Sequence, residues 1–465
     1  MSSIRSGSRN REIGASTMPM FQWSCRNARS YSSWRKFRTL RKEFRAWAMP
    51  SGCGTRKGDI ARTPGTDTFP VNLNTPGVFR GTGPLVLARD VHAVDQVHRL
   101  AADEAASGRS RRMIEGIRVA ILTPYGPSQP VGGIEVFNES LRRIFRDAET
   151  FASEGPPSPG PLGDFRRLGM QQPVGAVRAA RDLLRRHRRE PFDLVLSNGI
   201  YGWPLGLRRM NVPRIQIYHF TMAGFARQAL SLRGDRLTTG HVTAFFDRLA
   251  GIGTHVVAVS QRVVRELDAF YRLHAHLIPV AVDTGTFRPA NRASMRALLG
   301  LPQRVPIGLF VGRPHFTKGY DVLVRVASRM PDVLFVVAGG EGSRHGNILS
   351  LGRIAHEDLR LWYAASDFFF LPSRYEGFGL ALLEALSCNL PVVVSEAAWP
   401  FTEETRECGL VVRSRSDEDF IDAIRSVVAA RQQFTPREFI LPRYGTDAFR
   451  TNWQRFLDTV LDAGG

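Results

Sequence analysis

The pattern of hydrophobic and polar positions changes near residue 117. From there, short apolar runs alternate with longer amphipathic segments. The run 117–122 (IRVAIL) is typical of a strand that is buried on both faces of a parallel sheet. Further strands of this kind are expected at 192–196, 214–218, 255–259 and 276–280. Helical periodicity is found at 134–145, 174–188 and 261–270. This alternation predicts a parallel sheet with helices on both faces.

The segment 149–163 interrupts the alternation. It is rich in Pro, Gly and Ser and is expected to be a loop, at a place where the repeat calls for another strand.

The alternation resumes after Arg288 and Pro289 and indicates a second α/β unit. Its strands are expected at 307–311, 333–338, 367–371 and 391–395, and its helices at 320–330, 356–365, 379–387 and 417–431. A last helix within 446–463 is expected to pack back toward the first unit. We therefore expect an α/β protein with two Rossmann-like domains facing each other across a cleft, where the carboxyl ends of the strands meet a ligand. The domain boundaries are placed at 113–285, 286–445 and 446–465.

Residues 1–112 show no sustained period. Their first fifty residues hold nine serines and eleven basic residues against two acidic ones. Three interpretations stay open for this extension: a disordered basic arm, a translation start placed upstream of Met113, and a transit peptide.

Composition and the distribution of charge indicate which classes of protein the chain can belong to. The 465 residues are 43% hydrophobic and 23% charged, which is ordinary for a globular protein. Residues 1–112 hold 20 Lys/Arg against 8 Asp/Glu, so more than half of the net charge of +20 lies in a quarter of the chain. This distribution favours a basic arm on a mildly basic body, and no nucleic-acid partner is expected.

Membrane spans, secretion and metal binding are not expected either. No run of 18 apolar residues indicates a transmembrane helix, and the first residues lack the apolar core of a secretory signal. The four cysteines form no C-x-x-C pair and have no zinc-type spacing, which favours a reducing compartment.

Two glycine-containing turns of the second unit carry candidate chemistry. In the turn 312–319, Arg313 and Lys318 place a guanidinium and an ammonium between a strand and a helix, which suits a phosphate or pyrophosphate. A solvated basic turn is the alternative. In the turn 372–379, Glu376 precedes the helix that carries Glu384.

The two glutamates have a spacing that suits a nucleotide sugar. Helical geometry places them about 12 Å apart, and carboxylates accept hydrogen bonds from vicinal hydroxyls. The amides of Gly377, Phe378 and Gly379 at the helix start can face an anion. The alternative is a capping glutamate and a surface glutamate, which the apolar neighbours of Glu384 disfavour.

The first unit offers weaker candidates. Gly132 and Gly133 open a helix after the first strand, but they do not form G-x-G-x-x-G, and no acidic residue ends the second strand. A nicotinamide dehydrogenase is therefore disfavoured. His219 follows the strand 214–218, at an edge where cleft residues belong, and a structural histidine is the alternative there.

These residues together resemble the retaining GT-B glycosyltransferases, a group that includes sucrose synthases and many bacterial mannosyl- and glucosyltransferases. The matching stretches are FVGRPHFTKGYDVLVRVA, LGRIAHEDLRLWYAASDFFFLPSRYEGFGLALLEALSCNLPVVVS and GLVV, and upstream PYGPSQPVGGIEVFNESL, VVAVSQRVVREL and PVAVDTGTFRP. They cover residues 117–462, and the E-x7-E element within PSRYEGFG is the specific one. PVAVD departs from the more common PNGVD, and the segment 149–163 leaves the acceptor undefined.

The resemblance implies a role for each matching residue. The domain 113–285 would bind the acceptor and the domain 286–445 the donor. Arg313 and Lys318 would neutralise the donor diphosphate, and Glu376 would hold the hydroxyls of the donor sugar, close to the amides of Gly377, Phe378 and Gly379. Glu384 would accept the ribose hydroxyls, and Ile354 would contact the base through its backbone. Gly132 and Gly133 would approach the diphosphate and the acceptor, and His219 would lie beside the transferred sugar.

The implied reaction moves a hexosyl group from a nucleotide diphosphate sugar to a hydroxyl of a glycan, a lipid-linked acceptor or a small molecule, with retention. No metal and no further cofactor are expected, because Arg313, Lys318 and a helix N-terminus can stabilise the leaving diphosphate. A cytoplasmic protein that contacts an anionic membrane surface peripherally fits the basic charge. The alternatives are a nucleotide-sugar epimerase or phosphorylase of the same architecture and a non-catalytic binding module.

Overall fold

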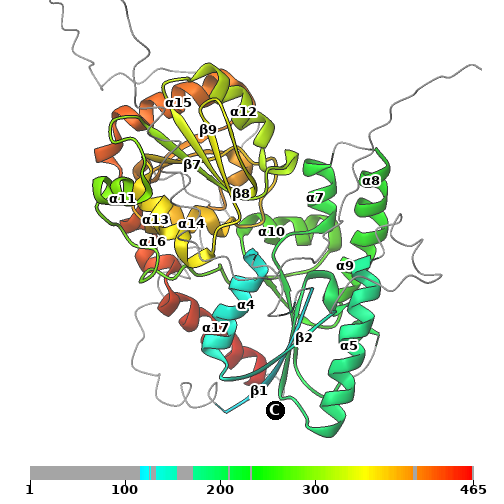
Figure 1. Cartoon of the computed structure of the whole chain (residues 1–465). Helices are drawn as coiled ribbons and strands as arrows, with labels where there is room; N and C mark the ends of the chain where they lie inside the picture. Colours follow the sequence, from blue (N-terminus) through cyan, green and yellow to red (C-terminus); the bar gives the residue numbers. More distant parts are fainter. Residues whose placement is uncertain are drawn as a thin grey trace, which may run out of the picture. The chain divides into compact units, whose positions relative to one another are not determined.

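The computed structural model describes residues 116–124, 126, 132–153, 171–207, 210–230, 233–401 and 406–462. The basic extension 1–112 lies outside the described residues, so its three interpretations stay predictions. Within the described part, the strands form two six-stranded sheets, and helices alternate with strands in each (Figure 1). The expected α/β fold with two parallel sheets is confirmed.

The first sheet has the strand order β2-β1-β3-β4-β5-β6. Its strands are β1 (Arg118–Thr123), β2 (Asp147–Ala152), β3 (Leu194–Asn198), β4 (Arg214–Tyr218), β5 (His255–Ala258) and β6 (His276–Leu277). All pairings are parallel. Because the order reverses at β1, the carboxyl ends of β1 and β3 form a switch point at which ligands bind in folds of this kind.

Strand β2 corrects the expectation of a loop beginning at residue 149. Asp147–Ala152 pairs in parallel with β1 at the edge of the sheet. Of its six residues (DAETFA), Phe151 is the buried one. An edge strand with one covered face needs few apolar residues, so it lacks the continuous apolar run of the central strands. The rest of the segment 154–163 lies outside the described residues.

The second sheet has the strand order β12-β11-β10-β7-β8-β9. Its strands are β7 (Ile307–Val311), β8 (Leu334–His345), β9 (Ile348–Gly352), β10 (Phe368–Leu371), β11 (Val392–Ser395) and β12 (Gly409–Val412). The carboxyl ends of β7 and β10 form its switch point, because β7 lies between β8 and β10. The turns 312–319 and 372–379 leave the sheet at these two ends.

Helices follow the strands in both sheets. Those of the first are α4 (Gly133–Ile144), α5 (Gln171–Arg189), α6 (Trp203–Gly206), α7 (Met222–Ala229), α8 (Arg233–Leu237), α9 (Ala244–Gly251) and α10 (Gln261–Glu266). Those of the second are α11 (Arg292–Leu299), α12 (Tyr320–Arg329), α13 (Leu359–Ala365), α14 (Leu380–Ser387), α15 (Asp417–Ala429) and α16 (Pro436–Tyr444). Their apolar faces are buried at helical spacing, as at Val322, Leu323 and Val326 of α12.

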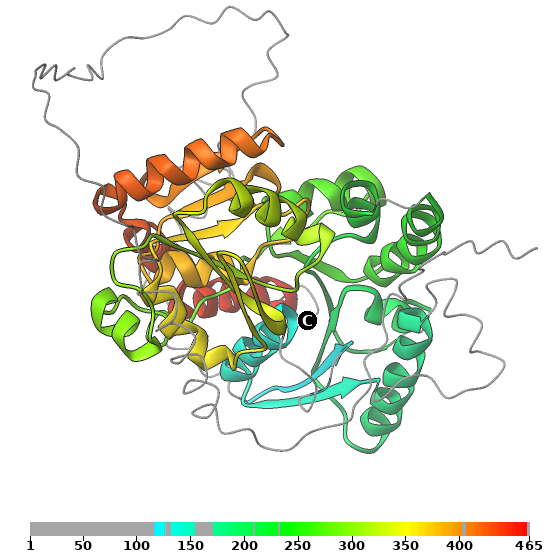
Figure 2. The same cartoon turned by 45° about the horizontal axis from the view of Figure 1, so that its top comes forward.

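The last helix, α17 (Thr446–Asp462), packs against α4. The ring of Phe449 lies 5.6 Å from that of Phe137, and Trp453 lies 6.4 Å from Phe145, both edge-on. Both views show α17 running beside α4 (Figures 1 and 2). The end of the chain therefore contacts a helix that follows the first strand. The domain boundaries themselves stay predictions.

Candidate functional site

The turns after β7 and β10 touch through their backbones. Gly319 has a φ of 72°, and a Cβ atom there would lie 2.0 Å from the carbonyl oxygen of Pro372. A side chain at position 319 would thus be strained and would collide with the neighbouring turn. This close approach brings the end of the first turn, with Lys318, to the turn that carries Glu376.

Lys318 and Glu376 form an ion pair. Lys318 Nζ lies 2.6 Å from Glu376 Oε1, and the hydroxyl of Ser373 donates a hydrogen bond of 2.9 Å to the same oxygen. Glu376 is 9% exposed, while the Lys318 side chain is 30% exposed. Since an ammonium has three donors and a carboxylate about four acceptor positions, both groups keep capacity for a ligand.

The structure does not bring Arg313 into this pair. The residue is exposed, and within the described part of the chain its guanidinium makes no hydrogen bond or ion pair. Its charge acts on His315, whose pKa is lowered first by burial and then by Arg313. Arg313 and Lys318 share a turn, but the pairing of the two cations on one ligand stays a prediction.

The glycines of the second turn contact other parts of the protein closely. A Cβ at Gly377 would lie 1.7 Å from the backbone oxygen of His219, and the hydroxyl of Ser260 donates a 2.6 Å hydrogen bond to the Gly377 oxygen. Gly379 has a φ of 86° and precedes α14. The Phe378 ring is buried and lies 6.0 Å from that of Phe401. Only the backbone amide of Phe378 is therefore a candidate for ligand binding.

Glu384 is held by two side chains that the sequence did not indicate. It is 2% exposed, and its Oε1 lies 2.5 Å from His356 Nε2, while Tyr363 donates a 2.8 Å hydrogen bond to Oε2. Burial disfavours the charged His356 ring, but the hydrogen bond and charge of Glu384 outweigh it and raise the pKa of His356. The alternative of a surface glutamate is therefore wrong.

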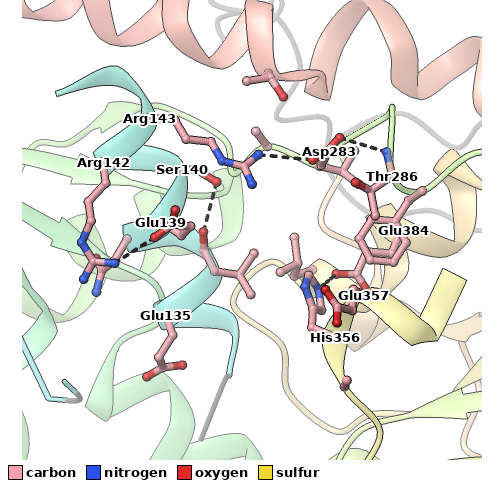
Figure 3. Close-up of a pocket in the computed structure, with 18 of the residues that line it drawn as sticks. Glu135, Glu139, Ser140, Arg142, Arg143, Asp283, Thr286, His356, Glu357 and Glu384 are labelled. Atoms are coloured by element: carbon pink, nitrogen blue, oxygen red, sulfur yellow. Dashed lines mark hydrogen bonds and ion pairs between the residues drawn. The ribbon is translucent and has the colours of Figure 1, made fainter. Parts of the chain in front are cut away.

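Glu384 also lines a pocket of about 560 Å³. Figure 3 shows Glu384 and His356 on one side of it and the side chains of α4 on the other. Arg143 of α4 reaches Asp283 with an Nη1–Oδ2 distance of 3.2 Å. Of the predicted site residues, Glu384 lines this pocket. Ile354, which is half-buried, lies just past β9 and two residues before His356.

His219 lies at the end of β4, beside the switch point of the first sheet. Its Nε2 is 2.8 Å from Asn198 Oδ1, and its ring contacts Phe137 edge-on at 4.7 Å. The amide of Asn198 donates to Leu122 O and Asn138 Oδ1, both at 3.1 Å, so its oxygen accepts the proton of His219 Nε2. Burial lowers the pKa of His219 to about 4. The imidazole is therefore neutral at pH 7, with its lone pair on Nδ1.

Gly132 and Gly133 form the start of α4. Gly132 N donates a 2.6 Å hydrogen bond to Glu135 Oε2, which caps the helix. Both glycines are exposed, and a Cβ at Gly133 would meet no atom within 4 Å. The Glu135 carboxylate already occupies the Gly132 amide at this helix N-terminus, so the binding of a ligand anion there stays a prediction.

The described residues contain neither a metal-binding cluster nor a membrane-spanning helix. No group of three or more His, Cys, Asp or Glu residues in the described ranges has the arrangement of a metal site. No helix in the part that the structure covers is both long and apolar enough to span a bilayer.

Two family models match the chain. The model described as Glycosyltransferase Family 4 matches residues 115–286, and the model described as Glycosyl transferases group 1 matches residues 305–430. Together they cover both sheets.

Curated relatives and solved structures give the same picture. The D-inositol 3-phosphate glycosyltransferase of Xylanimonas cellulosilytica is 32% identical, over 60% of this chain and 80% of the relative. The protein of that name from Saccharomonospora viridis is 32% identical over 58% of this chain and 69% of its own. Sucrose-phosphate synthase from Thermosynechococcus elongatus shares the fold with a TM-score of 0.63 at 21% identity, over 75% of this chain and all of the other. HepE from Anabaena, solved with UDP-glucose, gives 0.58 at 17% identity, over 74% of this chain and all of its own.

Proposed function

The chain belongs to the GT-B glycosyltransferases of group 1, which use nucleotide sugars as donors, and we propose that it transfers a hexosyl group to an acceptor hydroxyl with retention at the anomeric carbon. The observation that carries this proposal is the Lys318–Glu376 pair, 2.6 Å apart at the carboxyl ends of β7 and β10. At such a switch point, the cation can bind the diphosphate of a donor and the carboxylate can bind the hydroxyls of its sugar.

In the proposed reaction, the bond between the anomeric carbon and the diphosphate oxygen breaks, and the acceptor oxygen forms a new bond to that carbon. Negative charge develops on the leaving diphosphate, which takes up the proton of the acceptor hydroxyl. Lys318 stabilises this charge as a compact point charge, supported by Arg313 and the N-terminus of α4 at Gly132 and Gly133. These groups are cationic or electropositive already, so we propose that the reaction needs no metal ion.

The remaining predicted residues hold the donor. Glu376 accepts hydrogen bonds from the sugar hydroxyls beside the amides of Gly377, Phe378 and Gly379, and Glu384 accepts those of the ribose. Two of the roughly four lone-pair positions of Glu384 are already used by His356 and Tyr363, which leaves room for a diol. Neutral His219 offers the lone pair of Nδ1 to a hydroxyl of the transferred sugar. Ile354 contacts the base through its backbone.

The acceptor is a hydroxyl of a glycan, a lipid-linked compound or a small molecule. The relatives carry the name D-inositol 3-phosphate glycosyltransferase, which makes a polyol phosphate the first acceptor to test. A nucleotide-sugar epimerase or phosphorylase, and a binding module without activity, remain the outcomes against which the test is designed.

We also propose peripheral contact with an anionic membrane and a cytoplasmic location. Arg181, Arg188 and Arg189 on α5 are exposed and have no acidic partner within the described ranges. Arginines of this kind attract anionic lipid headgroups. Cys388 is buried and forms no disulfide within the described residues, which suits a reducing compartment. Salt-sensitive sedimentation with phosphatidylglycerol vesicles would support the contact, and no sedimentation would contradict it.

The test of the enzymatic proposal is a donor screen on the full chain. UDP-, GDP- and ADP-hexoses are incubated with and without inositol phosphate or a short glycan, and the released nucleoside diphosphate is measured. Acceptor-dependent release and an NMR coupling constant that shows the donor's anomeric configuration in the product are expected. Inverted product would refute retention. Conversion without an acceptor would favour an epimerase, dependence on phosphate a phosphorylase, and donor binding without turnover a binding module.

A further inference from the structure

Arg374 connects the two turns of the candidate site through its side chain. Its Nη1 and Nη2 each donate a 2.7 Å hydrogen bond to a different carboxylate oxygen of Asp321, in the first turn of α12. Nη1 also donates to the Phe316 carbonyl at 2.6 Å, and Cζ lies 3.6 Å from the centre of the Phe316 ring. Two-pronged pairing together with stacking on an aromatic ring is a geometry that arginine provides and lysine does not.

The contacts of Arg374 lie on both sides of Lys318 in the chain. Phe316 precedes it, Asp321 follows it, and the backbone N–H of Arg374 donates a 2.9 Å hydrogen bond to Thr317 O. Arg374 itself is two residues before Glu376. The side chain is 17% exposed, so water screens this pairing less than it screens a fully exposed ion pair. We call the contacts of Arg374 with Asp321 and Phe316 the clamp. It fixes two short stretches of backbone, one of which carries Lys318 and the other Glu376.

We propose that Arg374 is a positioning residue, which clamps residues 316–321 onto the turn of Glu376 and thereby sets the place of Lys318 Nζ. Its effect on turnover rests on the proposed function, because only a departing diphosphate requires Lys318 at a defined distance from the sugar site. Its effect on the placement of Lys318 is independent of any activity.

Helix α12 does not depend on Arg374 for its own attachment. Asp321 also pairs with Arg325 at 3.0 Å, and Arg325 pairs with Asp417 at 2.7 Å, at the start of α15. A second cation, Arg329, pairs with Glu418 at 2.6 Å. Removing Arg374 is therefore expected to free the turn 312–319 while α12 stays anchored to α15.

The chain offers a direct readout, because Lys318 is the sole lysine after Lys57 in the sequence. Amine-selective acylation of the full chain, followed by peptide mass analysis, reports Lys318 separately from Lys36, Lys42 and Lys57. Arg374→Gln and Asp321→Asn are each expected to raise the labelling rate of Lys318 by about threefold or more, because local opening exposes the amine. Arg329→Gln, which removes a cation of α12 that does not contact the second turn, is the matched control and should leave the rate unchanged.

Two further variants separate positioning from general destabilisation. Arg374→Lys keeps the positive charge but cannot form the two-pronged pair with Asp321. Lys318 should therefore be labelled as fast in this variant as in Arg374→Gln. If Arg374→Gln does not fold, Asp321→Asn breaks the same clamp with a side chain of equal size. An unchanged labelling rate in the folded clamp variants would overturn the proposal, and so would full restoration by Arg374→Lys.

Kinetics test the link to the reaction. Introduced alone, Arg374→Gln should lower kcat about tenfold. Introduced into the Lys318→Ala variant, it should lower kcat little further, because Arg374 acts through Lys318. Independent, multiplying losses in the two backgrounds would overturn the proposal. If labelling of Lys318 rises as expected while wild type transfers no sugar from any donor, the clamp stands and the proposed function fails.

Discussion

The hydroxyl of Tyr375 donates a hydrogen bond of 2.7 Å to Oε2 of Glu266, on α10. The hydroxyl of Thr221 donates to the same oxygen at 2.5 Å, and Glu266 is 6% exposed. Burial raises the pKa of Glu266, and the hydrogen bonds from Thr221 and Tyr375 oppose that rise. The turn that carries Glu376 is thus attached, through Glu266, to the segment that follows His219.

Tyr375→Phe removes one donor from this buried carboxyl, and we expect it to destabilise the protein by about 1–3 kcal/mol. Chemical denaturation measures the loss. Tyr320→Phe is the matched control, since that ring packs at 6.2 Å from Phe310 and its hydroxyl has no partner in the described ranges. Equal stability of the two variants would show that the Tyr375 hydroxyl contributes nothing.

Lys318→Ala removes the cation beside Glu376 and the proposed stabilisation of the leaving diphosphate. We expect kcat to fall by more than about tenfold, which corresponds to about 1.4 kcal/mol. Steady-state release of nucleoside diphosphate measures it, with Arg329→Ala as the control for loss of a positive charge elsewhere in the same domain. A Lys318→Ala enzyme with wild-type kcat would remove this residue from the site.

That the turns of Lys318 and Glu376 both follow strands of the second sheet could be anticipated from the sequence, whereas the direct contact of the two side chains could not. The runs 307–311 and 367–371 are strongly apolar, and each is followed by a glycine-containing turn, so both turns had to leave one edge of a parallel sheet. The side chains that complete the site could not be anticipated. His356 and Tyr363 reach Glu384 from another helix and turn, and no periodic pattern encodes the direction of such contacts.

The missed elements have a similar physical cause. Strand β2 is a polar edge strand, and β9 (Ile348–Gly352), which follows β8 after a short turn, was not among the expected strands. The exposure of Arg313 could not be predicted from the sequence either, because spacing along a turn does not determine the direction of a side chain. The roles of Gly132, Gly133, His219 and Ile354 toward a donor stay predictions.

Glu384→Ala is expected to weaken donor binding strongly while the fold persists. The variant loses the proposed partner of the ribose hydroxyls, so the donor KM should rise by about tenfold or more. Tyr363→Phe removes one donor to Glu384 but keeps the carboxylate, and it should change the KM much less. Equal effects of both variants would mean that Glu384 acts only through its packing.

The His356–Glu384 pair should also make stability depend on pH. The pKa of His356 in the folded state lies above its ordinary value near 6.5. The stabilisation is therefore fully present below pH 6.5 and is lost as the pH rises through the folded-state pKa. His356→Asn should remove this contribution, which denaturation at pH 6 and pH 9 measures as a smaller difference than in wild type. An unchanged difference would contradict the pairing.

Asp247 gives the sharpest pH prediction. This carboxyl is 1% exposed. It accepts a 3.0 Å hydrogen bond from the N–H of Met222, at the start of α7, and a 2.8 Å hydrogen bond from the Tyr271 hydroxyl. Burial raises its pKa to about 7 from an ordinary value of 3.8, against the effect of those hydrogen bonds. Because the folded state holds the proton more tightly, this contribution to stability is fully present below about pH 4 and disappears as the pH rises through about 7.

Asp247→Asn keeps the shape and the acceptor oxygen but cannot ionise. Between pH 4 and pH 8 the wild-type free energy of unfolding should therefore fall relative to that of the variant, by at most about 4 kcal/mol at 1.36 kcal/mol for each pKa unit. Asp182→Asn, at an exposed position on α5, is the control and should follow the wild-type profile. If Asp247→Asn and wild type run parallel across this range, Asp247 is ionised in the folded protein, and α7 begins against a buried negative charge.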